Sequence, residues 1–110
     1  MLIAESNIQK AIIDYLQYQA NIGKLWFVRV GSGKIKTEAG KWFTSGKPGC
    51  PDIIVCIKGR FIGLEVKTDK GMQSKAQKTA QRQIEACGGG YHVVRSIDDV
   101  IAILEGYYER

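Results

Sequence analysis

The chain has 110 residues, of which 45% are hydrophobic and 25% are charged. This length accommodates one domain with a single modest core, and the composition excludes a disordered protein. No stretch has the pattern of a signal peptide or a membrane span, so we expect one cytoplasmic domain over residues 1–110, with no membrane partner. The formal net charge of +5 favours an anionic partner such as nucleic acid.

The first predicted element is an amphipathic helix over residues 3–20, because apolar side chains recur at steps of three and four residues. Ser6 and Gln9 have the spacing of a capping box, although the helix can also begin one turn earlier. Glu5 shares a helix face with Ile8 and Ile12, which predicts that its side chain points inward. The helix macrodipole by itself favours a glutamate at this position equally well.

A predicted strand over residues 25–30 leads into a glycine-rich segment, residues 31–49. Lysines and an aromatic ring on such a segment suit contacts with phosphates and bases. An ordinary surface loop has the same composition, and its tryptophan would then pack on the core. The candidate nucleic-acid contacts here are Lys34, Lys36, Lys41, Trp42 and Lys47.

Two apolar runs flank Lys58-Gly59, which predicts a β-hairpin. With a two-residue turn, the numbers of opposed residues sum to 117, so Asp52 lies across from Glu65. Side chains alternate along a strand, so Lys67 shares the face of Glu65. A bulge beside the turn would shift this register by one residue.

Two carboxylates and an ammonium group therefore meet at one end of the hairpin. Carboxylates within about 5 Å of each other on a partly buried face repel unless a proton or a cation lies between them. Their oxygens, with the carbonyl of Val66, favour a hard ion such as Mg²⁺ or Mn²⁺. Lys67 would orient a water or steady a phosphate oxygen, which suits metal-assisted phosphodiester hydrolysis. The structural alternative is a turn-capping Asp52 beside a solvated Glu65–Lys67 pair.

The three cysteines, Cys50, Cys56 and Cys87, have no C-x-x-C spacing, and His92 is the one histidine. This set does not predict a zinc site. We expect reduced and mostly buried thiols.

The remaining elements are a helix from Met72 or Gln73 to Ala86, a strand over residues 91–94 and a final helix over residues 97–107 that Ser96 caps. The order α-β-β-β-α-β-α predicts an α/β fold, a small mixed β-sheet flanked by helices on both faces. Tyr107 and Tyr108 are candidates for an exposed interface or for closing the core. The first of these helices and the turn before it form a basic face, suited to a phosphate backbone or simply solvated: Lys70, Lys75, Lys78 and Arg82.

The hairpin and its flanks resemble a known family. Pro51-Asp52 followed by Glu65-Val66-Lys67 is similar to the PD-(D/E)XK nuclease signature. Residues 46–54, 63–67, 71–77 and 88–94 extend this to a resemblance to the VRR-NUC (virus-type replication-repair nuclease) family. The resemblance covers residues 5 to about 104 and implies a restriction-endonuclease-like core.

The resemblance implies a metal-dependent DNA endonuclease of replication or repair, often a homodimer acting on branched or Holliday-junction-like DNA. It implies a bacterial or phage-infected cell as the setting and no small-molecule cofactor. By the same resemblance Glu5 assists metal binding and Gln77 orients a water or the scissile phosphate. The alternatives are a nucleic-acid-binding module of the same fold without catalysis, or a structural partner subunit.

Overall fold

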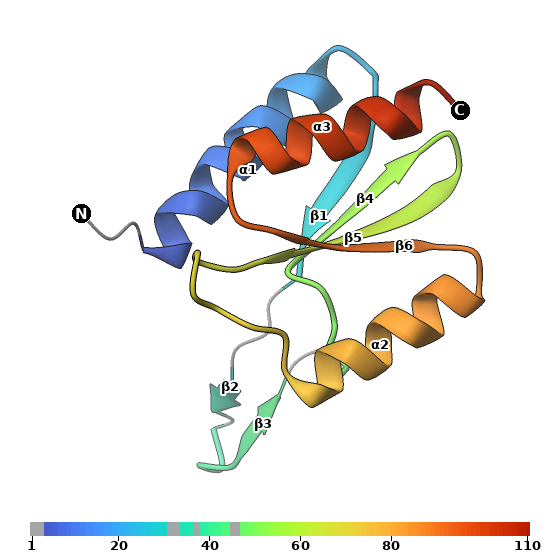
Figure 1. Cartoon of the computed structure of the whole chain (residues 1–110). Helices are drawn as coiled ribbons and strands as arrows, with labels where there is room; N and C mark the ends of the chain where they lie inside the picture. Colours follow the sequence, from blue (N-terminus) through green and yellow to red (C-terminus); the bar gives the residue numbers. More distant parts are fainter. Residues whose placement is uncertain (1–3, 31–33, 37, 45–46) are drawn as a thin grey trace.

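The computed structural model describes residues 4–30, 34–36, 38–44 and 47–110. Its centre is a four-stranded mixed sheet in which only the last pair of strands is parallel. The strand order is β1 (Trp26–Arg29), β4 (Ile53–Ile57), β5 (Arg60–Val66), β6 (Gly90–Val94). Two helices, α1 (Glu5–Asn21) and α3 (Ile97–Tyr108), lie on one face, and α2 (Lys75–Ala86) lies on the other (Figure 1). The predicted α/β architecture is therefore confirmed.

A second, two-stranded sheet pairs β2 (Lys34–Lys36) with β3 (Trp42–Thr44) inside the segment that the sequence predicted as a loop. This ribbon extends away from the main sheet (Figure 1). Three-residue strands among glycines carry too little periodicity to be predicted from sequence. The side chains of Lys34, Lys36 and Trp42 lie outside the described part of the structure, so their predicted contacts stay predictions.

Helix α1 begins at Glu5, with Ala4 as its N-cap and no side-chain capping bond. The earlier start is therefore correct, and the capping box at Ser6 is wrong. Glu5 is exposed, so the prediction that it points inward is also wrong. Glu5 lies in the first turn of α1, where the helix macrodipole stabilises a negative charge, as the alternative interpretation expected.

The β4–β5 hairpin has the predicted register, with Ile57 opposite Arg60 and Ile53 opposite Leu64. Its turn places Lys58 at φ 53° and Gly59 at φ 78°. Two successive positive φ angles define the type I′ turn, whose twist matches that of the flanking strands. The bulged alternative is therefore excluded, and Asp52 continues β4 directly opposite Glu65.

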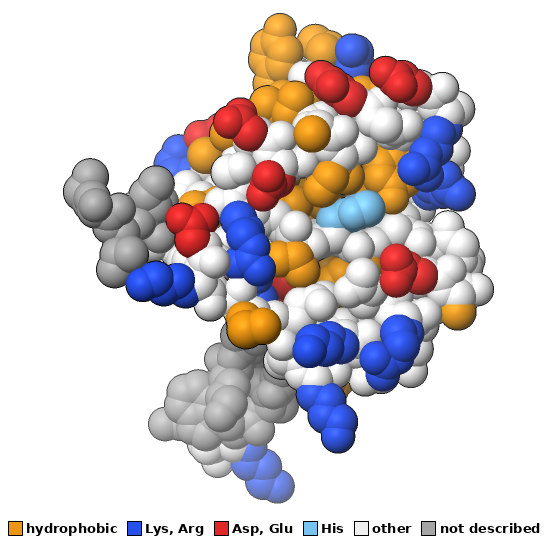
Figure 2. All heavy atoms as spheres, viewed as in Figure 1, with side chains coloured by type: hydrophobic (Ala, Val, Ile, Leu, Met, Phe, Trp, Pro, Cys, Tyr) orange, Lys and Arg blue, Asp and Glu red, His pale blue; other side chains and the backbone are white. Residues whose placement is uncertain are grey.

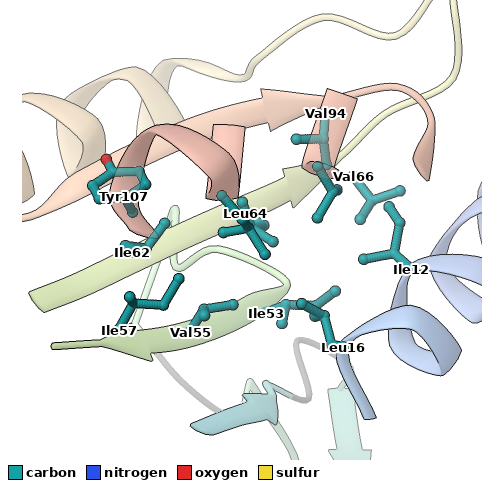
Figure 3. Close-up of a cluster of buried hydrophobic side chains, with 12 residues drawn as sticks. Ile12, Leu16, Ile53, Val55, Ile57, Ile62, Leu64, Val66, Val94 and Tyr107 are labelled. Carbon is teal, nitrogen blue, oxygen red and sulfur yellow. The ribbon is translucent and has the colours of Figure 1, made fainter. Parts of the chain in front are cut away.

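Strand β5 lies inside the sheet and has both of its faces occupied. One face supplies Ile62, Leu64 and Val66 to the hydrophobic core, which α1 and α3 cover (Figure 3). Gly63 and Glu65 point to the other face, because neighbouring side chains alternate. Tyr107 of α3 is buried in the core, so it closes the core rather than forming an exposed interface. The core residues of β4 and β5 are Ile53, Val55, Ile57, Ile62, Leu64 and Val66.

Helix α2 begins at Lys75, two or three residues later than predicted, because Ser74 and Gln77 form a capping box. Thr79, Ala80 and Ile84 are half-buried as expected, but Ala76 and Gln83 are exposed. The helix packs mainly over β6, the edge of the sheet, so it buries a narrower face than a helix over the sheet centre would.

The prediction for the thiols holds in part. All three cysteines are free; Cys50 and Cys56 are half-buried, whereas Cys87 is exposed. Cys87 is the C-cap of α2.

A single glycine sets the distance between β5 and the segment before β4. A Cβ atom at Gly63 would lie 2.7 Å from Cγ of the buried Pro51, the residue before Asp52. We expect Gly63→Ala to lower the free energy of unfolding by about 1–3 kcal/mol, since the proline must move. Urea denaturation measures this. Gly106→Ala in α3 meets open space and should raise stability by up to about 1 kcal/mol; equal effects of the two variants would contradict the packing argument.

Candidate functional site

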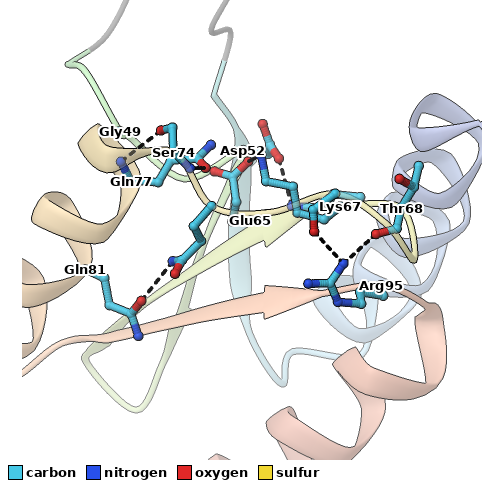
Figure 4. Close-up of polar contacts among 12 residues, drawn as sticks. Gly49, Asp52, Glu65, Lys67, Thr68, Ser74, Gln77, Gln81 and Arg95 are labelled. Atoms are coloured by element: carbon cyan, nitrogen blue, oxygen red, sulfur yellow. Dashed lines mark hydrogen bonds and ion pairs between the residues drawn. The ribbon is translucent and has the colours of Figure 1, made fainter.

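Asp52 is fixed in place by bonds to the strands on both sides of it. Its Oδ2 accepts a hydrogen bond from the backbone N–H of Val66 at 2.8 Å, and its carbonyl oxygen accepts one from Val30 at 2.8 Å. Pro51, the residue before Asp52, packs on Gly63 and so restrains the chain at this point. The Asp52 carboxylate is thereby fixed at the end of β5, where Figure 4 shows it beside Glu65 and Lys67.

Glu65 is a carboxylate inside the sheet, with only 3% of its surface exposed. Its Oε2 lies 3.9 Å from Nζ of Lys67. The Tyr91 hydroxyl lies 3.4 Å from Oε1 of Glu65 and 3.2 Å from the carbonyl oxygen of Gly49, and either atom accepts its hydrogen. The predicted convergence of Asp52, Glu65 and Lys67 on one spot is what the structure shows.

The electrostatics of the site are set by burial. Burial first, and then the adjacent carboxyl of Asp52, raise the pKa of Glu65 to about 8, against a smaller opposing effect of Lys67. Burial and the charge of Glu65 also raise the pKa of Tyr91, so its hydroxyl remains a neutral donor. Without a cation, the two carboxylates therefore share a proton at neutral pH, and a bound cation would replace that proton.

The donor set fits a hard divalent ion. The N–H of Val66 points to Asp52, and in an extended strand the N–H and C=O of one residue face the same neighbour, so the Val66 carbonyl faces that side too. Among the described residues, no group of three or more Asp, Glu, His or Cys side chains is gathered. Two carboxylates and a carbonyl suit Mg²⁺ or Mn²⁺, because Mg²⁺ usually keeps several of its waters.

Two predicted site residues, Glu5 and Gln77, are placed differently from Asp52, Glu65 and Lys67. Glu5 is exposed at the start of α1, and no described hydrogen bond or ion pair joins it to Asp52 or Glu65. The Oε1 of Gln77 accepts a hydrogen bond from the backbone N–H of Ser74 at 2.8 Å. The oxygen of Gln77 thus serves the helix start, and a role at a water or phosphate would fall to its amide nitrogen.

The structure adds two residues that sequence reasoning did not assign to the site. Tyr91 reaches Glu65 only because β6 pairs in parallel with β5, which no local pattern predicts. The Arg95 guanidinium donates to the carbonyls of Thr68 and Gly71, and so secures the turn after Lys67 (Figure 4).

The predicted basic face is present around α2. Figure 2 shows Lys and Arg side chains gathered over this helix. Lys41 and Lys47, in and after the β2–β3 region, are exposed as well. None of the described helices is long and apolar enough to cross a membrane. The exposed residues at α2 and the turn before it are Lys70, Lys75, Lys78 and Arg82.

Comparison with known proteins shows the fold. No family model matches the sequence, and no curated protein matches it. Among solved structures, one described as "VRR_NUC domain" matches with a TM-score of 0.66 at 21% identity, covering 94% of this chain and 97% of that one. The chain therefore has the fold of a VRR_NUC domain.

The raised pKa of Glu65 has a consequence for stability. Unfolding would lower this pKa from about 8 to an ordinary value near 4.5. Between those values the folded metal-free protein retains a proton that the unfolded chain releases, so the free energy of unfolding falls as pH rises. We expect the melting temperature in EDTA to drop from about pH 5 to about pH 8. Thermal denaturation at a series of pH values measures this.

The matched variants are Glu65→Gln and Glu109→Gln. Glu65→Gln should flatten the pH dependence, because the amide does not titrate. Glu109 is exposed, so its replacement should leave the slope unchanged. An unaltered slope in Glu65→Gln would show that another group is responsible.

Proposed function

We propose that this chain is a divalent-metal-dependent DNA endonuclease of the VRR-NUC type. The observation that carries the proposal is a carboxylate, Glu65, buried on an inner strand against Asp52 and next to Lys67. Two adjacent acids, one of them buried, are unfavourable unless a proton or a cation lies between them, which supports a binding role for the pair. The VRR_NUC-like fold supports the same reading.

A bound Mg²⁺ or Mn²⁺ would make a water more acidic and offset the charge that grows on the scissile phosphate. The other roles are assigned to residues of the chain. Asp52, anchored by the Val66 N–H, and Glu65 would hold the ion together with the Val66 carbonyl. The Lys67 ammonium group donates to the attacking water or to a phosphate oxygen. Gln77 and Glu5 have at most supporting roles at the periphery.

DNA is the proposed substrate, held by the basic residues around the site. Lys70, Lys75, Lys78 and Arg82 face solvent at α2, where a phosphate backbone would replace their counterions. The segment of β2 and β3, with Lys34, Lys36, Lys41, Trp42 and Lys47, would contact the same DNA. Lys67 and the α2 lysines lie within residues 67–78 of the chain, so we expect one duplex to contact both.

The proposed assembly follows from the one Asp52–Glu65 pair that each chain provides. A single Asp52–Glu65 pair cuts one strand, so a structure-selective enzyme that resolves branched, Holliday-junction-like DNA requires two copies, related by a two-fold axis. We therefore propose a homodimer. The resemblance to the VRR-NUC family is what supports a role in replication or repair, in the cytoplasm of a bacterial or phage-infected cell. Sedimentation of the protein with and without a four-way junction tests the homodimer.

Removal of any one of the three central side chains should abolish cleavage. We expect Asp52→Ala, Glu65→Ala and Lys67→Ala each to lower the rate by at least about 100-fold, the scale for loss of a group that stabilises developing charge. A panel of labelled branched and linear DNAs with Mn²⁺ measures this. Glu109→Ala, which removes an exposed carboxylate, is the control and should retain full activity. Full activity in folded Glu65→Ala protein would refute the assignment.

Metal binding separates the nuclease from a binding module that kept only the fold. Calorimetry with Mn²⁺ should show saturable binding that Asp52→Ala abolishes, with protons released because the shared proton leaves Glu65. Heats that differ between buffers of different ionisation enthalpy would reveal the proton. A module without catalysis needs no ion, so absence of binding in the parent protein would favour that alternative.

A further inference from the structure

The face of the sheet that carries Glu65 is only partly covered. Helix α2 packs over β6 at one edge of the sheet. At the opposite edge, the apolar side chains of Trp26 and Val28 in β1 remain exposed. Trp26 is 62% exposed, Val28 39% and Phe61 39%. Trp26 pairs with Cys56, and Cys56 pairs with Phe61, so all three side chains form one row across three strands. Two exposed aromatic rings thus flank a small thiol on an open sheet surface.

At Phe61 this row meets a groove of about 390 Å³ between α2 and the segment before β4. Its walls are largely apolar, with Pro48, Cys50 and Ile84 opposite Phe61. Two further hollows continue it: one shares Lys47 and Pro48 and adds Lys75, and the other shares Phe61 and adds Arg60. The result is a continuous trough along α2 with cations at each end and an aromatic ring in its middle.

The charge of this trough is of one sign. Among the described residues that line its three parts, none is acidic, whereas lysine or arginine stands at both ends. Anionic polymers with flat apolar side groups complement such a surface, because cations follow the backbone and rings stack on the bases. We propose that this face, the row of Trp26 and Phe61 together with the α2 trough, binds a single-stranded nucleic-acid segment.

A second copy of the chain fits this face less well. A two-fold contact places each patch against itself, so the basic ends of one trough would meet the basic ends or the apolar walls of the other. With no acidic partner among the described lining residues, that contact is repulsive or leaves lysines desolvated.

The trough and the catalytic site share one strand. Phe61, Gly63 and Glu65 are alternate residues of β5 and point to the same face, with Pro51 packed on Gly63 between them. At a strand rise of about 3.3 Å per residue, Phe61 and Glu65 are about 13 Å apart. The inference rests on the proposed nuclease function for its role: a single-stranded arm of a branched substrate would occupy the trough while a neighbouring phosphate reaches Asp52.

Binding is tested without catalysis, so that the two proposals fail separately. The probe is fluorescein-labelled (dT)12 titrated with the whole protein in EDTA, and fluorescence anisotropy reports the dissociation constant. Trp26→Leu and Phe61→Leu keep an apolar side chain but remove the ring. We expect each to weaken binding by about five- to tenfold, the scale of one lost stacking contact. Phe61→Tyr retains the ring and should bind as the parent does.

Two controls make the result specific. Ile22→Ala removes an apolar side chain that is 52% exposed at the end of α1, away from this face, and should not change the affinity. An abasic sugar-phosphate oligomer of equal length has the charge without the bases, so its weaker binding should be the same in the parent and in both leucine variants.

Unchanged affinity of Trp26→Leu and Phe61→Leu for (dT)12 would overturn the proposal. If sedimentation then showed that the same variants dissociate a dimer, the face would belong to a second copy instead. Cleavage of the labelled branched and linear DNAs by the parent protein, run in parallel with Mn²⁺, reports the nuclease function independently of either result.

Discussion

The arrangement of this protein depends on one buried carboxylate. Glu65 lies on an inner strand, 3% exposed, next to a second acid. Ionising both groups there without compensation would be strongly unfavourable, so the site must hold a proton or a cation. Lys67 and the Tyr91 hydroxyl compensate in part. The remaining imbalance would favour a divalent cation at this position, and under the proposed function it would connect stability, metal binding and catalysis to a single side chain.

The rest of the fold can be understood as support for that position. One face of β5 supplies core side chains under α1 and α3, which makes the strand rigid. The other face carries Gly63, whose lack of a side chain lets Pro51 approach and set Asp52 opposite Glu65. Gly49 contributes in the same way: a Cβ there would lie 2.1 Å from the Ala76 carbonyl oxygen, at φ 80°, so only glycine lets the start of α2 pack against this segment.

Two basic surfaces lie around this site, and they differ in chemistry. The outer side of α2 presents lysines and an arginine to solvent, which suits the phosphates of a duplex (Figure 2). The trough on the inner side combines cations with Phe61 and leads to Trp26, which suits unpaired bases. A nuclease acting on a branched DNA with an unpaired arm would use both kinds of contact, because such a substrate presents duplex and unpaired nucleotides together.

The sequence by itself determined whatever depends on neighbouring residues. Lys58-Gly59 predicted a hairpin turn whose two-residue form sets Asp52 opposite Glu65, although the observed register was needed to exclude a bulge, and Ser96 predicted the start of α3. Only the tertiary structure decided the rest. Tyr91 meets Glu65 through parallel pairing across an intervening helix, Glu5 faces solvent because α1 begins there, and Trp26 stays exposed because α2 packs over β6 instead. Turns and caps close over a few residues and have their own geometry, whereas these contacts join distant segments and depend on how the helices pack on the sheet.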